Sequence, residues 1–388
     1  MPSILPESLF PNDIQLAHSD LLRHEIHRAI QKHNGWIDFA QFMELALYAP
    51  GLGYYVAGSS KLGSSGDFVT APQLGHLFAA TLARACSAQL DKCGLKHSVI
   101  LELGAGTGQL AKDLLLALKE LGTLPERYLI LEVSPELKER QAHLLSSLPQ
   151  EITTQVEWLS QWPDAFQGVL IANEVLDAFA VHRVEKRVEG WWELGVGIEE
   201  GELVERAKPL NNALLMRELQ RLPSDIPTPY QTEVNLSALA LINTLAESLL
   251  AGAAFFIDYG FPAREFYHPQ RHQGTLMCHY RHIAHTDPLL LLGLQDITSH
   301  VDFTAVARRA RERGLAVKDY SSQARFLLDH GLLELLTQPN PLVNEASLRQ
   351  SQEVNMLMSP AEMGELFKVL VLGRGEVNMG ALSQLGLS

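Results

Sequence analysis

The chain has 388 residues, of which 46% are hydrophobic, enough for a large core and for more than a minimal single sheet. Its formal net charge of -14 argues against nonspecific binding to nucleic acid or to anionic membranes, because both need a positive surface. The 3 cysteines lack Cys-x-x-Cys spacing. No segment has the roughly 20 apolar residues of a membrane-crossing helix. Residues 1–20 resemble no targeting peptide. We therefore expect a cytoplasmic protein with neither a nucleic-acid partner nor a membrane insertion.

Residues 1–95 predict mainly helix, interrupted by a glycine- and serine-rich loop at 51–66. The apolar runs that follow have the length and composition of buried strands in a parallel sheet. They lie near residues 98–103, 128–133, 154–159, 168–173 and 253–258. Between the last two runs, alternating residues at 181–205 predict an antiparallel hairpin, and 235–251 predicts a helix.

The first of these strands leads into a glycine-rich turn, LELGAGTGQL at 101–110, which predicts a cofactor site. Glycines permit the tight turn and remove side chains that would keep a ligand from the backbone, and the next helix presents its amides there. The three glycines are Gly104, Gly106 and Gly108. Gln109 stands where a dinucleotide-binding turn has its last glycine. Because Glu102 suits an ammonium group better than a pyrophosphate, the turn indicates S-adenosylmethionine.

The second strand ends in an acid, Glu132. In a doubly wound sheet this acid lies beside the first turn, where a carboxylate can accept hydrogen bonds from both ribose hydroxyls of an adenosine. The stretch between the two strands, 109–121, carries leucines at helical spacing and predicts a helix that packs on the sheet. The sequence therefore predicts, in chain order, a strand, a glycine turn, a helix, a second strand and an acid.

The fourth strand ends abruptly in polar residues, in the sequence ANEVLDAF at 172–179. Ligands bind at this edge of open α/β sheets, so Asn173, Glu174 and Asp177 are candidates for the face next to a transferred methyl group. Helix capping is the alternative role for Asn173 and for Asp177.

The fifth strand repeats the pattern and brings Asp258 and Tyr259 to the same edge. A thiol and three imidazoles follow at 278–285, but no second cluster completes a zinc site there, so we expect no metal. Farther on, His300 lies in the segment before a predicted helix that runs through Ala310.

Seven segments together resemble the MidA-like methyltransferases, which include a mitochondrial complex I assembly factor that methylates arginine in protein. The segments are GDFVTAP (66–72), LELGAGTGQL (101–110), LEVSPEL (131–137), ANEVLDAFAVHRV (172–184), FIDYG (256–260), QDITSHVDF (295–303) and SPAEMGELFKVLVL (359–372). They span the chain in order from about residue 20 to 375. One departure is Ala105, where family members commonly have proline. Without a transit peptide, the chain resembles a bacterial member.

The resemblance implies an α/β fold with a Rossmann-like, seven-stranded class I methyltransferase sheet, a helical N-terminal region and inserted hairpin and helical elements. It implies that S-adenosylmethionine is held by the glycine turn and Glu132, under a lid that includes Gly66, Asp67, Phe68 and Thr70. We expect residues 1–97 to form the helical region and lid. Residues 98–388 then form the methyltransferase domain, with insertions at about 181–235 and 261–300.

The family's function makes an arginine in a protein the expected substrate. A guanidinium is a cation and a poor nucleophile, so a carboxylate must bind it and favour proton loss as the new bond forms. We expect Glu174 to be this catalytic carboxylate and Asp177 its helper. Tyr259 or His300 would orient the substrate, and a core or loop role is the alternative for each. Glu102 and Asn173 join the expected cofactor site.

Two other classes of protein stay open at this point. A noncatalytic assembly or binding protein can retain a cofactor fold, since partner binding leaves little trace in a sequence. A nucleotide-dependent oxidoreductase would use the same sheet, but Gln109 and Glu102 disfavour it. The expected partner is a protein with an accessible arginine, and a homodimer stays open.

Overall fold

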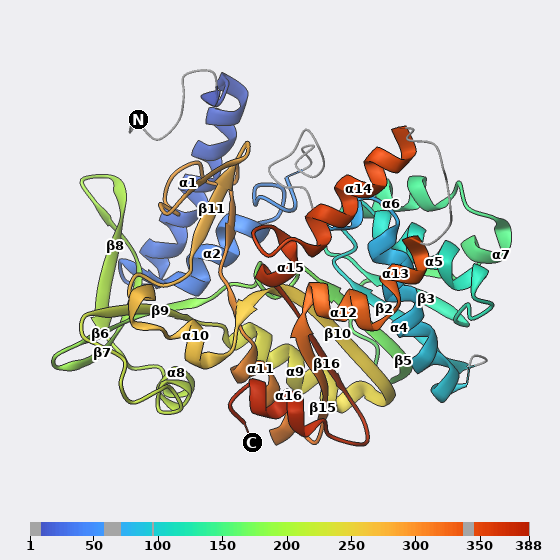
Figure 1. The fold of residues 1–388 in the computed structure, drawn as a ribbon. Coiled ribbons are helices and arrows are strands. Elements are labelled where there is room, and N and C mark those ends of the chain that lie inside the picture. Colours follow the sequence, from blue (N-terminus) through green and yellow to red (C-terminus); the bar gives the residue numbers. More distant parts are fainter. Residues whose placement is uncertain (1–8, 58–70, 95–96, 337–344, 388) are drawn as a thin grey trace. The chain divides into compact units, whose positions relative to one another are not determined.

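Figure 1 shows the computed structural model of the chain, which describes residues 9–57, 71–94, 97–336 and 345–387. Contacts between residues divide the chain into two compact units. Unit 1 contains Met1–Phe68, Asp177–Ala240 and Phe261–Asp302, and unit 2 contains Val69–Leu176, Leu241–Gly260 and Phe303–Ser388. Each unit is thus built from separate stretches of the chain.

In unit 2, the central sheet has the strand order β15-β16-β10-β5-β2-β3-β4. The strands are β2 (Val99–Leu103), β3 (Arg127–Leu131), β4 (Val156–Leu159), β5 (Phe166–Asn173), β10 (Leu249–Phe261), β15 (Ala316–Ser322) and β16 (Phe367–Gly373). The pairs from β10 to β4 are parallel, whereas β16 is antiparallel to both of its neighbours. Every residue of β2 is buried, as expected for a parallel strand covered on both faces.

Helices pack on the sheet and contribute most of the buried residues of the core around it. The predicted helix at 109–121 is confirmed as α5 (Gln109–Glu120), whose leucines at positions 110, 114, 115 and 118 are buried against α4 and the sheet. The remaining helices that lie wholly in unit 2 are α3 (Ala71–Leu74), α4 (Leu77–Cys93), α6 (Pro135–Leu145), α7 (Gln150–Thr153), α11 (Phe303–Glu312), α12 (Gln323–Asp329), α13 (Leu332–Leu336), α14 (Glu345–Met358), α15 (Met363–Leu366) and α16 (Met379–Gln384). The helix predicted at 235–251 is confirmed as α9 (Leu236–Ser248).

Unit 1 contains a second, antiparallel sheet of order β1-β7-β6-β9, with β8 also paired to β7, and a small sheet of order β12-β11-β13. The hairpin predicted at 181–205 is confirmed by the antiparallel pairing of β7 with β6 and with β8. The elements are α1 (Asp13–Lys32), β1 (Trp36–Asp38), α2 (Phe39–Tyr48), β6 (His182–Arg187), β7 (Gly190–Glu199), β8 (Glu202–Pro209), α8 (Ala213–Leu219), β9 (Tyr230–Val234), α10 (Ala263–Phe266), β11 (Met277–Tyr280), β12 (Ile283–His285), β13 (Asp296–Thr298) and β14 (Val301–Asp302).

The N-terminal region is helical as predicted in its described part, but it also contributes a strand. Trp36–Asp38 forms β1 and pairs with Gly195–Gly197 of β7. The predicted domains, 1–97 and 98–388, follow the order of the chain. The grouping by contacts instead joins the N-terminal residues to the two inserted stretches. The predicted domains stay a prediction. Each helix of the described residues is too short or too polar to cross a membrane.

A close approach between strands makes Gly168 a sensitive position in the central sheet. Gly168 of β5 pairs with Val99 of β2 and has φ +131. A Cβ on Gly168 would lie 2.1 Å from the Val99 carbonyl oxygen and 2.8 Å from the Val99 nitrogen, both of them backbone atoms that cannot rotate away. Any side chain there would force β5 and β2 apart.

We expect Gly168→Ala to lower the free energy of unfolding by about 2 kcal/mol or more beyond the loss caused by Gly190→Ala. Gly190 is a matched control because it has φ +128 but nothing within 4 Å of its Cβ position. The difference between the two losses of unfolding free energy therefore excludes the effect of positive φ and reports the clash with Val99. Urea unfolding followed by circular dichroism measures both losses, and equal losses would contradict the close approach.

Candidate active site

The turn between β2 and α5 takes a left-handed path at each of its three glycines. Gly104, Gly106 and Gly108 have φ values of +58, +54 and +84, and Gly108 is the N-cap residue of α5. Residues with a side chain rarely adopt this conformation, so the glycines are required by the backbone itself. The Gly104 N–H donates to the Leu131 carbonyl oxygen at 3.1 Å, which joins the turn to the end of β3.

Glu132 follows β3 beside this turn, and Gln141 of α6 joins the two. One Glu132 carboxylate oxygen accepts from the Ser134 N–H and the other from Gln141 Nε2, each at 2.9 Å. Gln141 Nε2 also donates to the Gly106 carbonyl oxygen at 2.9 Å. Burial raises the pKa of Glu132, and the hydrogen bonds from Ser134 and Gln141 oppose that rise. Sequence reasoning missed Gln141, although it lies between Leu137 and Leu145 in a stripe at i, i+4 spacing, where a polar residue signals a buried role.

Glu102 is almost fully buried on β2, with 2% of its surface exposed. The Tyr128 hydroxyl donates to its Oε2 at 2.8 Å. The pKa of Glu102 is raised to about 7, chiefly by burial and also by the charge of Glu132, while the Tyr128 hydrogen bond opposes the rise. Contact between Glu102 and a cofactor ammonium group stays a prediction.

The segment after β5 lies against the glycine turn and holds Glu174 in an unusual conformation. Glu174 has φ +53, and its N–H donates to the Ile257 carbonyl oxygen at 2.9 Å. A left-handed residue other than glycine is uncommon and often marks a functional site. A Cβ on Gly104 would lie 3.5 Å from Val175 Cγ2, so this segment and the turn are neighbours. Asn173 Nδ2 donates to Glu174 Oε1 at 3.0 Å.

Asp258 fixes the backbone that follows Glu174. This side chain is fully buried on β10, and its Oδ2 accepts from the Val175 and Leu176 amides at 3.2 and 2.8 Å. Its Oδ1 accepts from the Tyr259 N–H at 2.9 Å. The sequence placed Asp258 at the correct edge of the sheet but gave no sign that its partners would be these amides.

The four predicted catalytic residues belong to different units. Glu174 and Tyr259 lie in unit 2, where the Tyr259 ring packs on Phe367 with centroids 3.9 Å apart. Asp177 and His300 lie in unit 1. Burial lowers the pKa of His300 to about 4, so its imidazole is neutral at neutral pH. The catalytic roles of all four stay predictions, and the predicted lid residues Gly66, Asp67, Phe68 and Thr70 lie outside the described residues.

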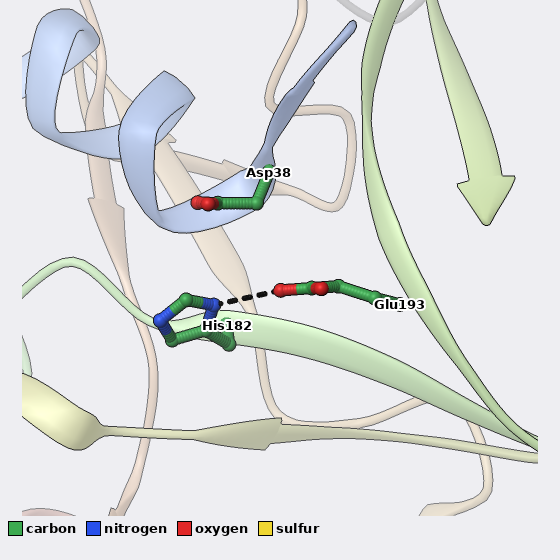
Figure 2. A group of neighbouring side chains, drawn as sticks. All are labelled: Asp38, His182 and Glu193. Atoms are coloured by element: carbon green, nitrogen blue, oxygen red, sulfur yellow. Dashed lines mark hydrogen bonds and ion pairs between the residues drawn. The ribbon is translucent and has the colours of Figure 1, made fainter. Parts of the chain in front are cut away.

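Unit 1 brings Asp38, His182 and Glu193 together on one face of its larger sheet, as Figure 2 shows. Their donor atoms lie within 4.8 Å of one another, a spacing that a metal ion could bridge. However, the Asp38 side chain caps α2 by accepting from the Gln41 N–H at 2.8 Å, and His182 Nδ1 is hydrogen-bonded to Glu193 Oε1 at 3.0 Å. A helix cap and a cross-strand hydrogen bond account for this cluster, and we assign no metal to it.

The buried Glu102 should make stability depend on pH. A carboxyl group whose pKa rises from 4.5 to about 7 on folding stabilises the fold fully below pH 4.5, and this contribution is lost as pH rises through about 7. We expect the stability of the wild type relative to Glu102→Gln to fall by on the order of 3 kcal/mol over this range. Urea unfolding between pH 4.5 and 8 measures it. Glu139→Gln on the exposed side of α6 controls for the change in formal charge, and a difference independent of pH would contradict the assignment.

Comparisons with known proteins identify the family. A family model described as "Putative S-adenosyl-L-methionine-dependent methyltransferase" matches residues 81–321. The mitochondrial protein arginine methyltransferase NDUFAF7 is 28% identical in Danio rerio, covering 88% of this chain and 86% of that protein. In Homo sapiens it is 29% identical and covers 91% and 83%. These matches confirm the MidA-like resemblance.

A solved structure agrees over nearly the whole chain. The crystal structure of a COG1565 superfamily member from Burkholderia thailandensis, bound to S-adenosyl-homocysteine, is 43% identical, with a TM-score of 0.90 and 98% of each chain covered. This likeness confirms the class I methyltransferase fold, and it sets the oxidoreductase alternative aside. The chain therefore belongs to this family of S-adenosyl-L-methionine-dependent methyltransferases, and S-adenosylmethionine is its cofactor.

Proposed function

We propose that the chain transfers the methyl group of S-adenosylmethionine to an arginine side chain in a protein substrate. The observation that carries the proposal is Glu174, a carboxylate with φ +53 directly after β5 and beside the glycine turn. The NDUFAF7 relatives, at 28–29% identity, are named protein arginine methyltransferases. A net charge of -14 is also compatible with a cationic partner.

The chemistry explains why a carboxylate is needed at this position. Methyl transfer from a sulfonium is an in-line displacement, so aiming the nucleophile at the methyl carbon supplies much of the catalysis. A guanidinium presents its N–H groups as a planar fork that a carboxylate can hold through two parallel hydrogen bonds. Glu174 would orient this fork, draw positive charge away from the attacking nitrogen and favour its loss of a proton. Asp258 supports the role by fixing the amides of Val175 and Leu176.

The proposed cofactor site is made of residues other than Glu174, which is assigned to the substrate guanidinium. The glycine turn offers close backbone approach, Glu132 a carboxylate for the ribose hydroxyls, and Glu102 a carboxylate for the ammonium group. Asn173 Oδ1 is buried and has no hydrogen-bond partner among the described residues, so it has the capacity to accept from a ligand. These features fit S-adenosylmethionine, which supplies the methyl group when it is bound.

Gly106→Val should weaken S-adenosylmethionine binding about tenfold or more, because a branched side chain would stand where the ligand approaches the backbone. Gly122→Val is the matched control. Gly122 also has positive φ, at +70, but nothing lies within 4 Å of its Cβ position. Isothermal titration calorimetry measures both affinities. Undiminished binding by a folded Gly106→Val protein would show that the turn is not the cofactor site.

Glu174→Gln keeps the shape of the side chain and removes its charge. We expect the rate of methyl transfer to fall by about 10²-fold or more while the affinity for S-adenosylmethionine stays within about twofold. Glu200→Gln is the control, since Glu200 also has positive φ, at +51, but is exposed in the turn after β7. Transfer of labelled methyl groups into a lysate of cells that lack this protein measures the rate.

These experiments test the role of Glu174 and the identity of the methylated residue separately. Full activity in Glu174→Gln, or a loss of cofactor binding in proportion to activity, would show that Glu174 does not act on the substrate. Mass spectrometry of the labelled protein identifies the methylated residue. Methylarginine is the expected product, and exclusive methylation of another residue type would overturn the arginine proposal while leaving the methyltransferase assignment intact.

A further inference from the structure

Gln141 is a buried polar side chain on a face of α6 that is otherwise apolar. It has no exposed surface and lies one helical turn from both Leu137 and Leu145, which are also buried. Burying an amide is unfavourable unless its donors and acceptor are satisfied, so the partners of Gln141 are informative.

Those partners use both hydrogens and the oxygen of the amide and fix its orientation. The two hydrogens of Nε2 match two acceptors, the Gly106 carbonyl oxygen and Glu132 Oε2, each at 2.9 Å. On the other side, Oε1 accepts from the indole N–H of Trp158 on β4 at 3.0 Å. An indole N–H can only donate, so the amide cannot flip without placing two donors face to face. Trp158 therefore locks the NH₂ group toward the glycine turn and Glu132.

We propose that Gln141 is a positioning residue for S-adenosylmethionine, which holds the glycine turn and the Glu132 carboxylate in a fixed mutual geometry before the cofactor arrives. This inference rests on the proposed roles of Gly106 and Glu132. One amide ties a carbonyl of the turn, which comes from β2, to a carboxylate that comes from β3. A site that is already ordered loses less conformational entropy on binding, so its affinity is higher.

The amide also favours the charged form of Glu132, which is the form that accepts from ribose hydroxyls. Burial raises the pKa of Glu132, and the Gln141 hydrogen bond opposes the rise. Binding should therefore weaken as pH falls through this pKa, and removing the amide should move the midpoint of that loss to higher pH. Glu102 on β2 is the other acid coupled to Glu132, so the pH series is repeated in a Glu102→Gln background.

Gln141→Met keeps the length of the side chain and removes the amide. We expect the dissociation constant for S-adenosylmethionine to rise about tenfold or more, as for other hydrogen bonds to charged groups. The turnover rate at saturating cofactor should change by less than about threefold, and the midpoint of the pH dependence should shift upward. Calorimetry and steady-state methylation measure these quantities on the full chain.

Gln323→Met is the matched control, because Gln323 of α12 is equally buried and donates its amide to the Leu357 carbonyl oxygen at 3.1 Å. It should lower stability without changing cofactor affinity or the pH midpoint. Trp158→Phe removes the indole N–H that donates to Gln141 and keeps an aromatic ring, and it should weaken binding by a smaller factor, about threefold. Should Gln141→Met not fold, Trp158→Phe decides, and unchanged affinity in that variant would overturn the inference.

Two further outcomes separate this inference from the function on which it rests. If Glu132→Gln abolishes cofactor binding while Gln141→Met binds normally, the positioning role of Gln141 is wrong and the cofactor site stands. If Glu132→Gln binds normally, the proposed role of Glu132 fails first, and the positioning role fails with it. The affinity measurements do not depend on which residue of the substrate is methylated.

Discussion

β2 pairs in parallel with β3 on one side and with β5 on the other, and the candidate site follows from this constraint. Parallel strands end at the same edge of a sheet, so residues about 30 and 70 positions apart meet there. The glycine turn, Glu132 and Glu174 each follow one of these strands. Because the strands are buried on both faces, their register is set by the core, and the positions of the polar residues are set with it.

The elements with strong local patterns could be predicted from the sequence, and the pairings between distant segments could not. Apolar runs located β2, β3, β4, β5 and β10 of the central sheet, and a leucine stripe located α5, since each signal lies within one element. The antiparallel strands β15 and β16 were not located in this way. The pairing of Trp36–Asp38 with Gly195–Gly197 joins segments far apart in the chain. A strand of three residues is too short to show a pattern that would predict this pairing. The grouping of residues 1–68 with two later stretches is likewise a property of contacts rather than of composition.

The candidate site divides in the same way. Glycines reveal a turn because their type is tied to backbone conformation, whereas the φ of +53 at Glu174 is invisible in a glutamate. Gln141 and Asp258 were not foreseen in their roles, because their function depends on which backbone groups and side chains they meet. Both hydrogen-bond polar groups that follow the carboxyl ends of the strands. The roles of such supporting residues depend on their partners in the fold, so they are found in the structure and not in the sequence.

The electrostatics of this edge explain why two acids can lie so near each other in unit 2. Burial, and to a smaller extent the charge of Glu132, raise the pKa of Glu102 to about 7, so Glu102 is partly protonated near neutral pH and the repulsion between the two acids is limited. Neighbouring groups hydrogen-bond both acids: Tyr128 donates to Glu102, while Gln141 and Ser134 donate to Glu132. In the proposed cofactor site, the positive charge of bound S-adenosylmethionine would favour the charged form of Glu102. The same burial that makes these acids unfavourable in isolation therefore increases their preference for a cation.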